Sequence, residues 1–241
     1  MSALQQMQSD THKPRLERSG VKRLIQILVS VLLMGSMLFL SAGRLDWSAA
    51  WIFLGSYVLV ILTLGAWVVR KFPDVVNERG KIAHNARSWD KVLMTIYSVM
   101  LLGLFAVAGL DAGRFGWSVM PIAFQVTGFA ALIGAMVVTY WAMATNPFLS
   151  TIVRIQDDRG HYVITTGPYR YVRHPMYAAT LLMWPGIALE LGSWWALIPA
   201  AVIVIVFVIR TALEDQTLQA ELPGYVDYAQ HTRYRLAPGV W

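Results

Sequence analysis

The chain contains four apolar segments long enough to cross a lipid bilayer, and they restrict its fold more than any other feature. These segments lie at roughly residues 24–42, 48–69, 92–110 and 119–144. A spanning helix needs about 20 mainly apolar residues, because the hydrocarbon core is about 30 Å thick. Within that core the backbone must satisfy its own hydrogen bonds, so each segment is predicted to be a helix.

Two shorter apolar segments follow at roughly 177–191 and 194–209, separated only by Gly192-Ser193. This spacing predicts a tight helical hairpin that spans the bilayer fully or part-way. Pro185-Gly186 predicts a kink in the first arm, which neighbouring helices can tolerate. The sequence therefore predicts an all-α fold, a polytopic membrane helical bundle.

Lysines and arginines are distributed unevenly between the two sets of loops that six segments create. With the N-terminus inside, the cytoplasmic stretches hold 5, 6, 4 and 3 of them, at 1–23, 70–91, 145–176 and 210–241. The opposite side holds only Arg44 and Arg114. This bias follows the positive-inside rule. We expect a multi-pass protein, in a bacterial inner membrane, with both termini in the cytoplasm.

The composition excludes several classes of function. Charged residues make up only 14% of the chain, against about 25% in soluble proteins. The chain has no cysteine, which excludes disulfides, thiolate catalysis and cysteine-based metal sites. It also lacks metal-binding and phosphate-loop motifs, so we expect no metal. The net charge of +6 is explained by membrane topology rather than by a nucleic-acid partner.

Residues 160–177 form a polar, cationic stretch between two apolar segments, and they read G-H-Y-V-I-T-T-G-P-Y-R-Y-V-R-H-P-M-Y. Gly167-Pro168 predicts a turn, and Pro175 predicts a helix start. A helix N-terminus beside Arg170 and Arg173 favours an anion, and the tyrosines could stack on a base or face a cation. A basic loop that contacts anionic lipid head groups explains the same residues equally well.

Other charged residues are interpreted more simply. Arg210 and Glu214 are four residues apart and share one helix face. They are interpreted either as a pair in which the arginine snorkels to the membrane surface or as functional groups inside the bundle. Three carboxylates are predicted to be solvated: Asp90, Glu190 and Asp215. The stretch with Tyr225, Tyr228, Arg233 and Arg235 predicts an amphipathic segment on the membrane face.

The ordered set of motifs resembles the isoprenylcysteine carboxyl methyltransferase family, with phospholipid N-methyltransferases as looser relatives. It consists of the 160–177 stretch, then R-x-x-x-E-D from Arg210, then P-G-Y-x-x-Y from Pro223. The resemblance covers about residues 145–241. It implies three regions: a cytosolic tail (1–23), four transmembrane helices (24–144), and a methyltransferase core with the hairpin and a C-terminal cytosolic segment (145–241).

The family implies an enzyme that transfers a methyl group from S-adenosylmethionine to a lipophilic carboxylate or amine in the membrane. Its cofactor pocket would lie on the cytosolic side, built from the C-terminal loops and helices. Carried over by position, the cofactor contacts are Arg154, His161, Tyr162, Val163, Ile164, Tyr169, His174, Pro175, Met176, Tyr177 and Glu214. Arg210 matches the arginine placed near the acceptor, so Arg210 and Glu214 are the predicted catalytic residues.

Two departures and two alternatives remain open. Ala178-Ala179 stands where many relatives have a glycine, and Glu214-Asp215 is shorter than the acidic run of eukaryotic members, so the acceptor is not fixed. A membrane reductase of the sterol-reductase type, using NADPH, shares the R-H-P-x-Y motif. A non-catalytic lipid-binding protein is the other alternative.

The predicted topology can be tested by cysteine labelling, because the chain has no native cysteine. Single cysteines at Arg44, Arg114 and Ser193 are expected to react with an impermeant reagent from outside. Labelling that appears only after the membrane is opened would reverse the orientation.

Overall fold

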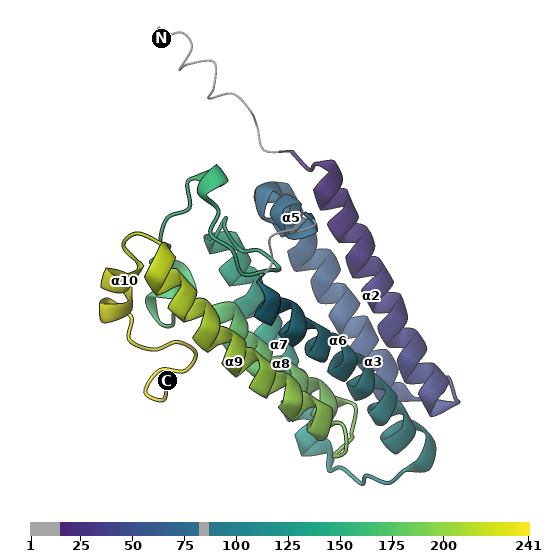
Figure 1. Cartoon of the computed structure of the whole chain (residues 1–241). Coiled ribbons are helices and arrows are strands. Elements are labelled where there is room, and N and C mark those ends of the chain that lie inside the picture. Colours follow the sequence, from purple (N-terminus) through teal and green to yellow (C-terminus); the bar gives the residue numbers. More distant parts are fainter. Residues whose placement is uncertain (1–14, 82–86) are drawn as a thin grey trace, which may run out of the picture.

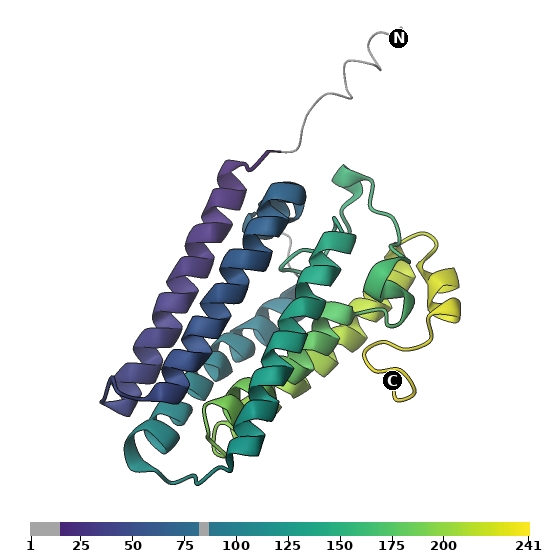
Figure 2. The same ribbon diagram turned by 180° about the vertical axis from the view of Figure 1, so that it is seen from behind.

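A computed structural model describes residues 15–81 and 87–241 of the chain. Within these ranges the structure is built from helices and loops and contains no strand, as Figures 1 and 2 show from opposite sides. The predicted all-α polytopic bundle is therefore confirmed. Most of the tail predicted at 1–23 lies outside the described residues.

Five helices are long and apolar enough to cross a membrane, and two of them contain a π-helical turn. They are α2 (Arg18–Ala42), α3–η2–α4 (Ser48–Val60, Ile61–Gly65 and Ala66–Lys71), α6–η3 (Ser88–Ala108 and Gly109–Phe115), α7 (Ile122–Thr145) and α9 (Leu197–Glu221). The remaining α-helices are shorter: α5 (Pro73–Gly80), α8 (Pro175–Glu190) and α10 (Tyr225–His231).

The predicted hairpin is present as α8 and α9, which pack against each other and turn between residues 191 and 196. Its two arms are unequal, since α8 has 16 residues and α9 has 25. At 1.5 Å per residue, α8 is about 24 Å long, which is short of the hydrocarbon thickness. It lies among α7 and α9 instead, and most of its side chains are buried. The helix begins at Pro175, as the sequence predicts.

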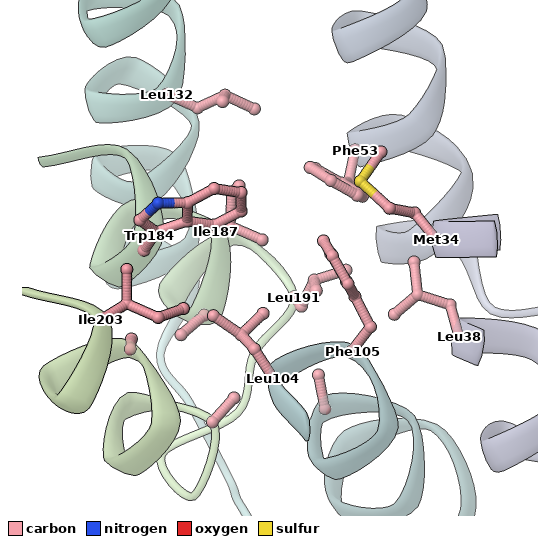
Figure 3. Packing of buried hydrophobic residues seen from close by; sticks show 14 of the residues in the cluster. Met34, Leu38, Phe53, Leu104, Phe105, Leu132, Trp184, Ile187, Leu191 and Ile203 are labelled. Carbon is pink, nitrogen blue, oxygen red and sulfur yellow. The ribbon is translucent and has the colours of Figure 1, made fainter. Parts of the chain in front are cut away.

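The apolar core lies where the long helices meet, and lipid-facing side chains cover the outside. Figure 3 shows its centre, where fully buried side chains from six helical elements meet: Leu38, Phe53, Leu104, Phe105, Leu132, Ile187, Leu191 and Ile203. Many leucines, isoleucines and valines on the outer helix faces are exposed instead, such as Leu32, Leu62 and Ile205. A bundle embedded in a bilayer requires apolar side chains on its outer surface as well as in its core.

The turns at one end of the bundle are tied together by a buried carboxylate. Asp111 accepts hydrogen bonds from the backbone N–H and the hydroxyl of Ser118, at 2.8 and 2.6 Å, and from the Ser193 hydroxyl at 2.6 Å. Ser193 is fully buried, so a cysteine there would not react with an external reagent, while Arg44 and Arg114 are exposed. The prediction that Glu190 is solvated was also wrong, because the end of α8 is enclosed and only 3% of the residue is exposed.

Helices α7 and α8 approach each other closely through two glycines. A Cβ atom added at Gly128 would collide with the carbonyl oxygen of Gly186 and the backbone nitrogen of Glu190. A Cβ added at Gly186 would meet the carbonyl oxygen of Gly128 at 3.0 Å. Small residues of this kind let helices in membranes pack backbone to backbone. The two glycines therefore fix the position of the short helix α8 and of the loop that precedes it.

We predict that Gly128→Ala destabilises the protein, by about 1–3 kcal/mol, because the added methyl group overpacks this contact. Gly134→Ala on the same helix is the matched control, since a Cβ there has nothing within 4 Å. Thermal unfolding in detergent measures both variants. Equal melting temperatures would show that the α7–α8 approach is loose.

Candidate functional site

The candidate site lies at the end of the bundle opposite the Asp111 turns, where residues 146–174 connect α7 to α8. The segment is irregular apart from two short 3-10 turns, η4 (Asp157–Arg159) and η5 (Gly167–Arg170). Gly167 has φ +58° and lies against the side chain of Thr145, so a larger residue would meet both strain and a collision. The turn leads into η5, where the Tyr169 carbonyl meets Tyr228 of α10 before α8 begins.

A pocket opens between this loop and α9, with about 770 Å³ of space not filled by atoms, part of it open to solvent. Its walls include all eleven residues predicted as cofactor contacts. They are Arg154, His161, Tyr162, Val163, Ile164, Tyr169, His174, Pro175, Met176, Tyr177 and Glu214. The structure thus brings together residues spread over about 60 positions of sequence, while their contact with a cofactor stays a prediction.

The pocket also contains residues that the sequence analysis did not predict as cofactor contacts. From the loop these are Asn146, Phe148, Leu149, Ser150, Ile152, Val153 and Arg173, and from the C-terminal part they are Leu218, Leu222, Tyr225 and Tyr228. Tyr225 and Tyr228 were predicted to lie on the membrane face, and this was wrong. Both are buried, and the Tyr228 hydroxyl donates to the Tyr169 carbonyl at 2.6 Å. The P-G-Y-x-x-Y motif was the signal that could have placed them.

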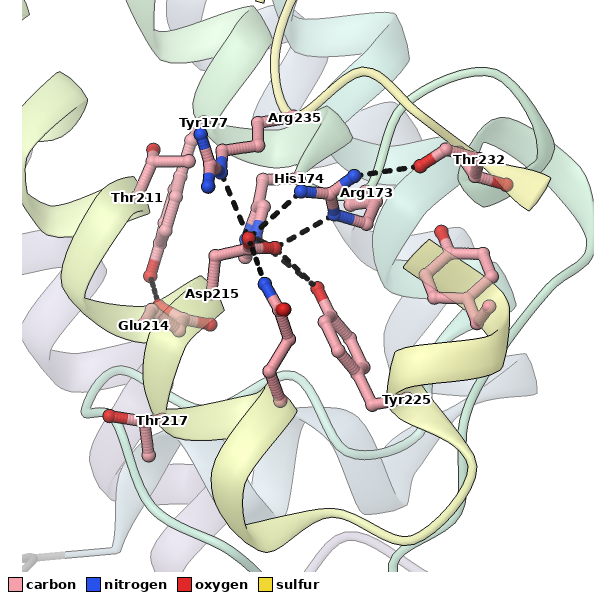
Figure 4. A network of polar contacts seen from close by, with 12 residues as sticks. Arg173, His174, Tyr177, Thr211, Glu214, Asp215, Thr217, Tyr225, Thr232 and Arg235 are labelled. Atoms are coloured by element: carbon pink, nitrogen blue, oxygen red, sulfur yellow. Dashed lines mark hydrogen bonds and ion pairs between the residues drawn. The ribbon is translucent and has the colours of Figure 1, made fainter. Parts of the chain in front are cut away.

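Asp215 is the centre of the polar network beside the pocket (Figure 4). Its carboxylate accepts two hydrogen bonds from Arg173, both 2.8 Å, and one from Arg235 at 2.9 Å. The Tyr225 hydroxyl donates to it at 3.0 Å, and His174 Nε2 lies 3.2 Å away. The prediction that Asp215 is solvated was therefore wrong. Its exposed fraction is 0% because donors from three other elements close over it.

Glu214, the preceding residue, points to the other side of α9. Its Oε2 accepts a hydrogen bond from the Tyr177 hydroxyl at 2.5 Å, which joins α9 to the first turn of α8. The Tyr177 ring stacks on His174 with an interplanar angle of 6° and a centroid distance of 5.8 Å. No arginine, lysine or histidine among the described residues forms an ion pair with Glu214. Tyr177 is the only described side chain that bonds to this carboxylate, so its second oxygen can meet a ligand in the pocket.

Arg210 lies outside the pocket lining and behind Tyr177. Its Nε donates to Asp90 at 2.8 Å, its Nη2 donates to the Thr151 carbonyl at 3.0 Å, and its Cζ lies 5.2 Å from the Tyr177 ring centre. Asp90 was predicted to be solvated, and this was wrong, since only 1% of it is exposed. The helix starts at Ser88, earlier than the predicted 92, and so carries Asp90 into the bundle. The predicted role of Arg210 toward an acceptor stays a prediction.

Arg154 is held by a third carboxylate, Glu78, from the short helix α5. The Nη2 atom of Arg154 donates to Glu78 at 2.7 Å, and Lys81 lies 2.9 Å from the same carboxylate. Burial alone would raise the pKa of Glu78, but the hydrogen bonds from Arg154 and Lys81 outweigh it and hold that pKa below its usual value. Glu78 is therefore ionised at neutral pH, and it neutralises the guanidinium of Arg154.

His161 packs into the wall as a neutral ring. Its ring centre lies 4.5 Å from that of Phe148, and its Nδ1 accepts a hydrogen bond from the backbone N–H of Gln156 at 3.4 Å. Burial lowers the pKa of His161. The accepting Nδ1 leaves the ring proton on Nε2, so this histidine can offer one donor to a ligand.

One comparison with known proteins matches the part of the chain that contains the pocket loop. Residues 123–222 match the family model described as phospholipid methyltransferase. The matched stretch runs from α7 through the pocket loop, α8 and α9. A search of curated proteins found no match. The family match supports the broader family of integral membrane methyltransferases.

We predict that Asp215→Asn lowers the free energy of unfolding by about 3–5 kcal/mol, because Arg173 and Arg235 would then lie beside a neutral amide. Asp227→Asn on α10 is the control, since Asp227 is exposed. Thermal unfolding in detergent measures both. A loss no greater than that of the control would show that the network around Asp215 does not hold the site together.

Proposed function

We propose that the protein transfers a methyl group from S-adenosylmethionine to a lipophilic acceptor, with the pocket holding the cofactor. One observation carries the proposal. The pocket combines a carboxylate that has no cationic partner, Glu214, with aromatic walls and two arginines that are already neutralised. Such a pocket suits a ligand that carries a positive sulfonium and an aromatic base.

The charges of the pocket favour this cofactor over NADPH. A nicotinamide dinucleotide carries several phosphate charges and requires free cations or helix N-termini. Both arginines in the pocket lining are committed to carboxylates, Arg154 to Glu78 and Arg173 to Asp215. The reductase alternative would leave several phosphate charges with only the N-terminus of α8 as a partner.

The lining also provides the neutral contacts that S-adenosylmethionine needs. Tyr162, Val163 and Ile164 lie outside any helix, and their backbone groups form no hydrogen bond with other described backbone atoms. They can therefore pair with the edge of an adenine ring. Phe148 and Tyr169 provide flat surfaces for stacking. Glu214 can accept hydrogen bonds from amino or hydroxyl groups of the ligand.

When bound, the cofactor supplies an electrophilic methyl group: a lone pair of the acceptor bonds to carbon while the sulfur–carbon electron pair returns to sulfur. The task of the protein is to hold both partners in line. Glu214 and Tyr177 would fix the donor side. Arg210, which is paired with Asp90 and stands behind Tyr177, would act on the acceptor side by positioning Tyr177. A carboxylate acceptor needs no base, and an amine acceptor must lose a proton.

The finer assignments also belong to this proposal. The isoprenylcysteine carboxyl methyltransferase subfamily is supported by the ordered motifs of residues 160–177 and 210–228. A cytoplasmic pocket in a bacterial inner membrane is supported by the concentration of lysine and arginine in the loops at that end. The cofactor would enter from water, and the acceptor from the bilayer.

We predict that Glu214→Gln weakens S-adenosylmethionine binding about tenfold or more, since a charge-assisted contact becomes neutral. Glu221→Gln is the control, because Glu221 lies on the same helix but is exposed and outside the pocket. Isothermal titration calorimetry on detergent-purified protein gives both affinities, with NADPH titrated in parallel. Binding of NADPH in place of S-adenosylmethionine would support the reductase, and unchanged affinity in Glu214→Gln would remove Glu214 from the site.

A further inference from the structure

Two partly buried arginines at the pocket end of the bundle have no described carboxylate partner, which separates them from the other arginines that are at least partly buried. Arg79 on α5 and Arg23 on α2 are both partly buried, and no described carboxylate lies within ion-pair distance of either. Every other described arginine that is at least partly buried has such a partner: Arg87, Arg154, Arg159, Arg173, Arg210 and Arg235. Buried charges are normally paired, because leaving water is costly.

The contacts of these two guanidinium groups inside the protein are weak. Nη1 of Arg79 lies 3.7 Å from the sulfur of Met176, and a thioether is a poor acceptor. Nη1 of Arg23 lies 3.4 Å from the neutral side chain of Gln26. Burial lowers the pKa of Arg79 to about 10, and the neighbouring charge of Arg23 adds to this effect. An arginine side chain keeps its proton at neutral pH, so both groups can bind an anion.

The fold brings the two arginines together through a close helix contact. Helix α5 packs against the pocket-side end of α2 (Figure 1). At Gly80 any Cβ atom would collide with the carbonyl of Ser19, and it would lie 3.2 Å from the Cβ of Arg23. Around Arg23, within electrostatic range, lie three tyrosines from other helices: Tyr57, Tyr97 and Tyr140. Each is partly buried and has a hydroxyl with no hydrogen bond to another described residue.

This polar cluster adjoins the cofactor pocket. Met176, which contacts Arg79, lines the pocket, and so does the next residue, Tyr177. Helix α5 contributes to both the pocket and the polar cluster, because Glu78 binds Arg154 of the pocket while Arg79 contacts Met176. An anionic group at Arg79 would therefore lie one side chain away from the cofactor. Arg210 is less suited to this task, since Asp90 already neutralises it.

We propose that Arg79, assisted by Arg23, binds an anionic group, a carboxylate or a phosphate, of the membrane-soluble acceptor. The tyrosine hydroxyls add neutral donors around this anion. That the bound molecule is the methyl acceptor rests on the proposed function. The anion site itself rests on the unpaired guanidinium groups. It names the class of acceptor: a lipophilic molecule with an anionic group close to the atom that receives the methyl group.

The test uses three single-chain probes that differ only in the head group: dodecyl phosphate, dodecanoate and dodecanol. Native mass spectrometry of the full chain in neutral detergent counts the bound molecules. We expect both anions to bind wild-type protein and dodecanol not to. Arg79→Gln should lower the affinity for the anions about tenfold or more, because a charge-assisted hydrogen bond is lost. The ratio between the two anions distinguishes phosphate from carboxylate recognition.

Arg70→Gln is the matched control, since Arg70 is an exposed arginine on the adjoining helix α4. Equal losses in both variants would mean diffuse attraction to surface cations and would overturn the proposal, as would unchanged binding in Arg79→Gln. Arg79→Lys keeps the charge without the planar fork and should bind with intermediate affinity. Arg79→Lys serves as the second variant if Arg79→Gln aggregates in detergent. Wild-type affinity for the anions in both Arg79→Lys and Arg23→Gln would also overturn the proposal.

S-adenosylmethionine titrations on the same samples separate this inference from the proposed function. Arg79→Gln should keep wild-type cofactor affinity, because Arg79 does not line the pocket. If wild-type protein binds the anions through Arg79 but does not bind S-adenosylmethionine, the proposed function fails and the anion site remains. If the cofactor binds and Arg79 has no effect on the anions, the anion site fails and the proposed function remains.

Discussion

The buried carboxylate of Asp215 is the interaction on which the pocket depends. Removing a carboxylate from water costs several kcal/mol, and only several well-placed donors can offset this cost. Here the donors come from the start of α8, from α10 and from the C-terminal segment, through Arg173, Tyr225 and Arg235. Breaking one contact leaves the others with uncompensated charge. The loop, the two helices and the chain end are therefore held as one unit.

Two further buried carboxylates extend this principle to the N-terminal half of the chain. Asp90 on α6 neutralises Arg210, and it also accepts the backbone N–H of Val153 at 3.1 Å. Glu78 on α5 holds Arg154. The pocket loop is thus anchored by carboxylates from three different helices, α5, α6 and α9. The first helices do more than fix the protein in the membrane, since they also position the walls of the site.

The same pairing divides the pocket end of the bundle into regions of different electrostatic character. Where arginines and carboxylates are paired, they stabilise the fold. Glu214 and Arg79 have no ionic partner among the described residues, and they contact successive residues of the first turn of α8, Tyr177 and Met176. The region at Glu214 is suited to a cationic ligand and the region at Arg79 to an anionic one. A helix start between two regions of opposite charge is a suitable place for a donor and an acceptor to meet.

The sequence by itself determined the long helices, the hairpin and half of the pocket wall, the half that its motifs contain. Helix spans follow from local hydrophobicity, because the bilayer imposes one length on every crossing segment. The wall residues from His161 to Tyr177 are nearly contiguous, so their motif identifies them without a three-dimensional arrangement. Only the tertiary structure decided the state of Asp90, Glu190 and Asp215, which appeared solvated in the sequence and are buried. Whether a charged side chain is buried depends on partners that lie far away in sequence, 120 residues for Arg210 and Asp90. Local patterns do not carry that information, and the same reason kept the unpaired state of Arg79 hidden until the helices were packed.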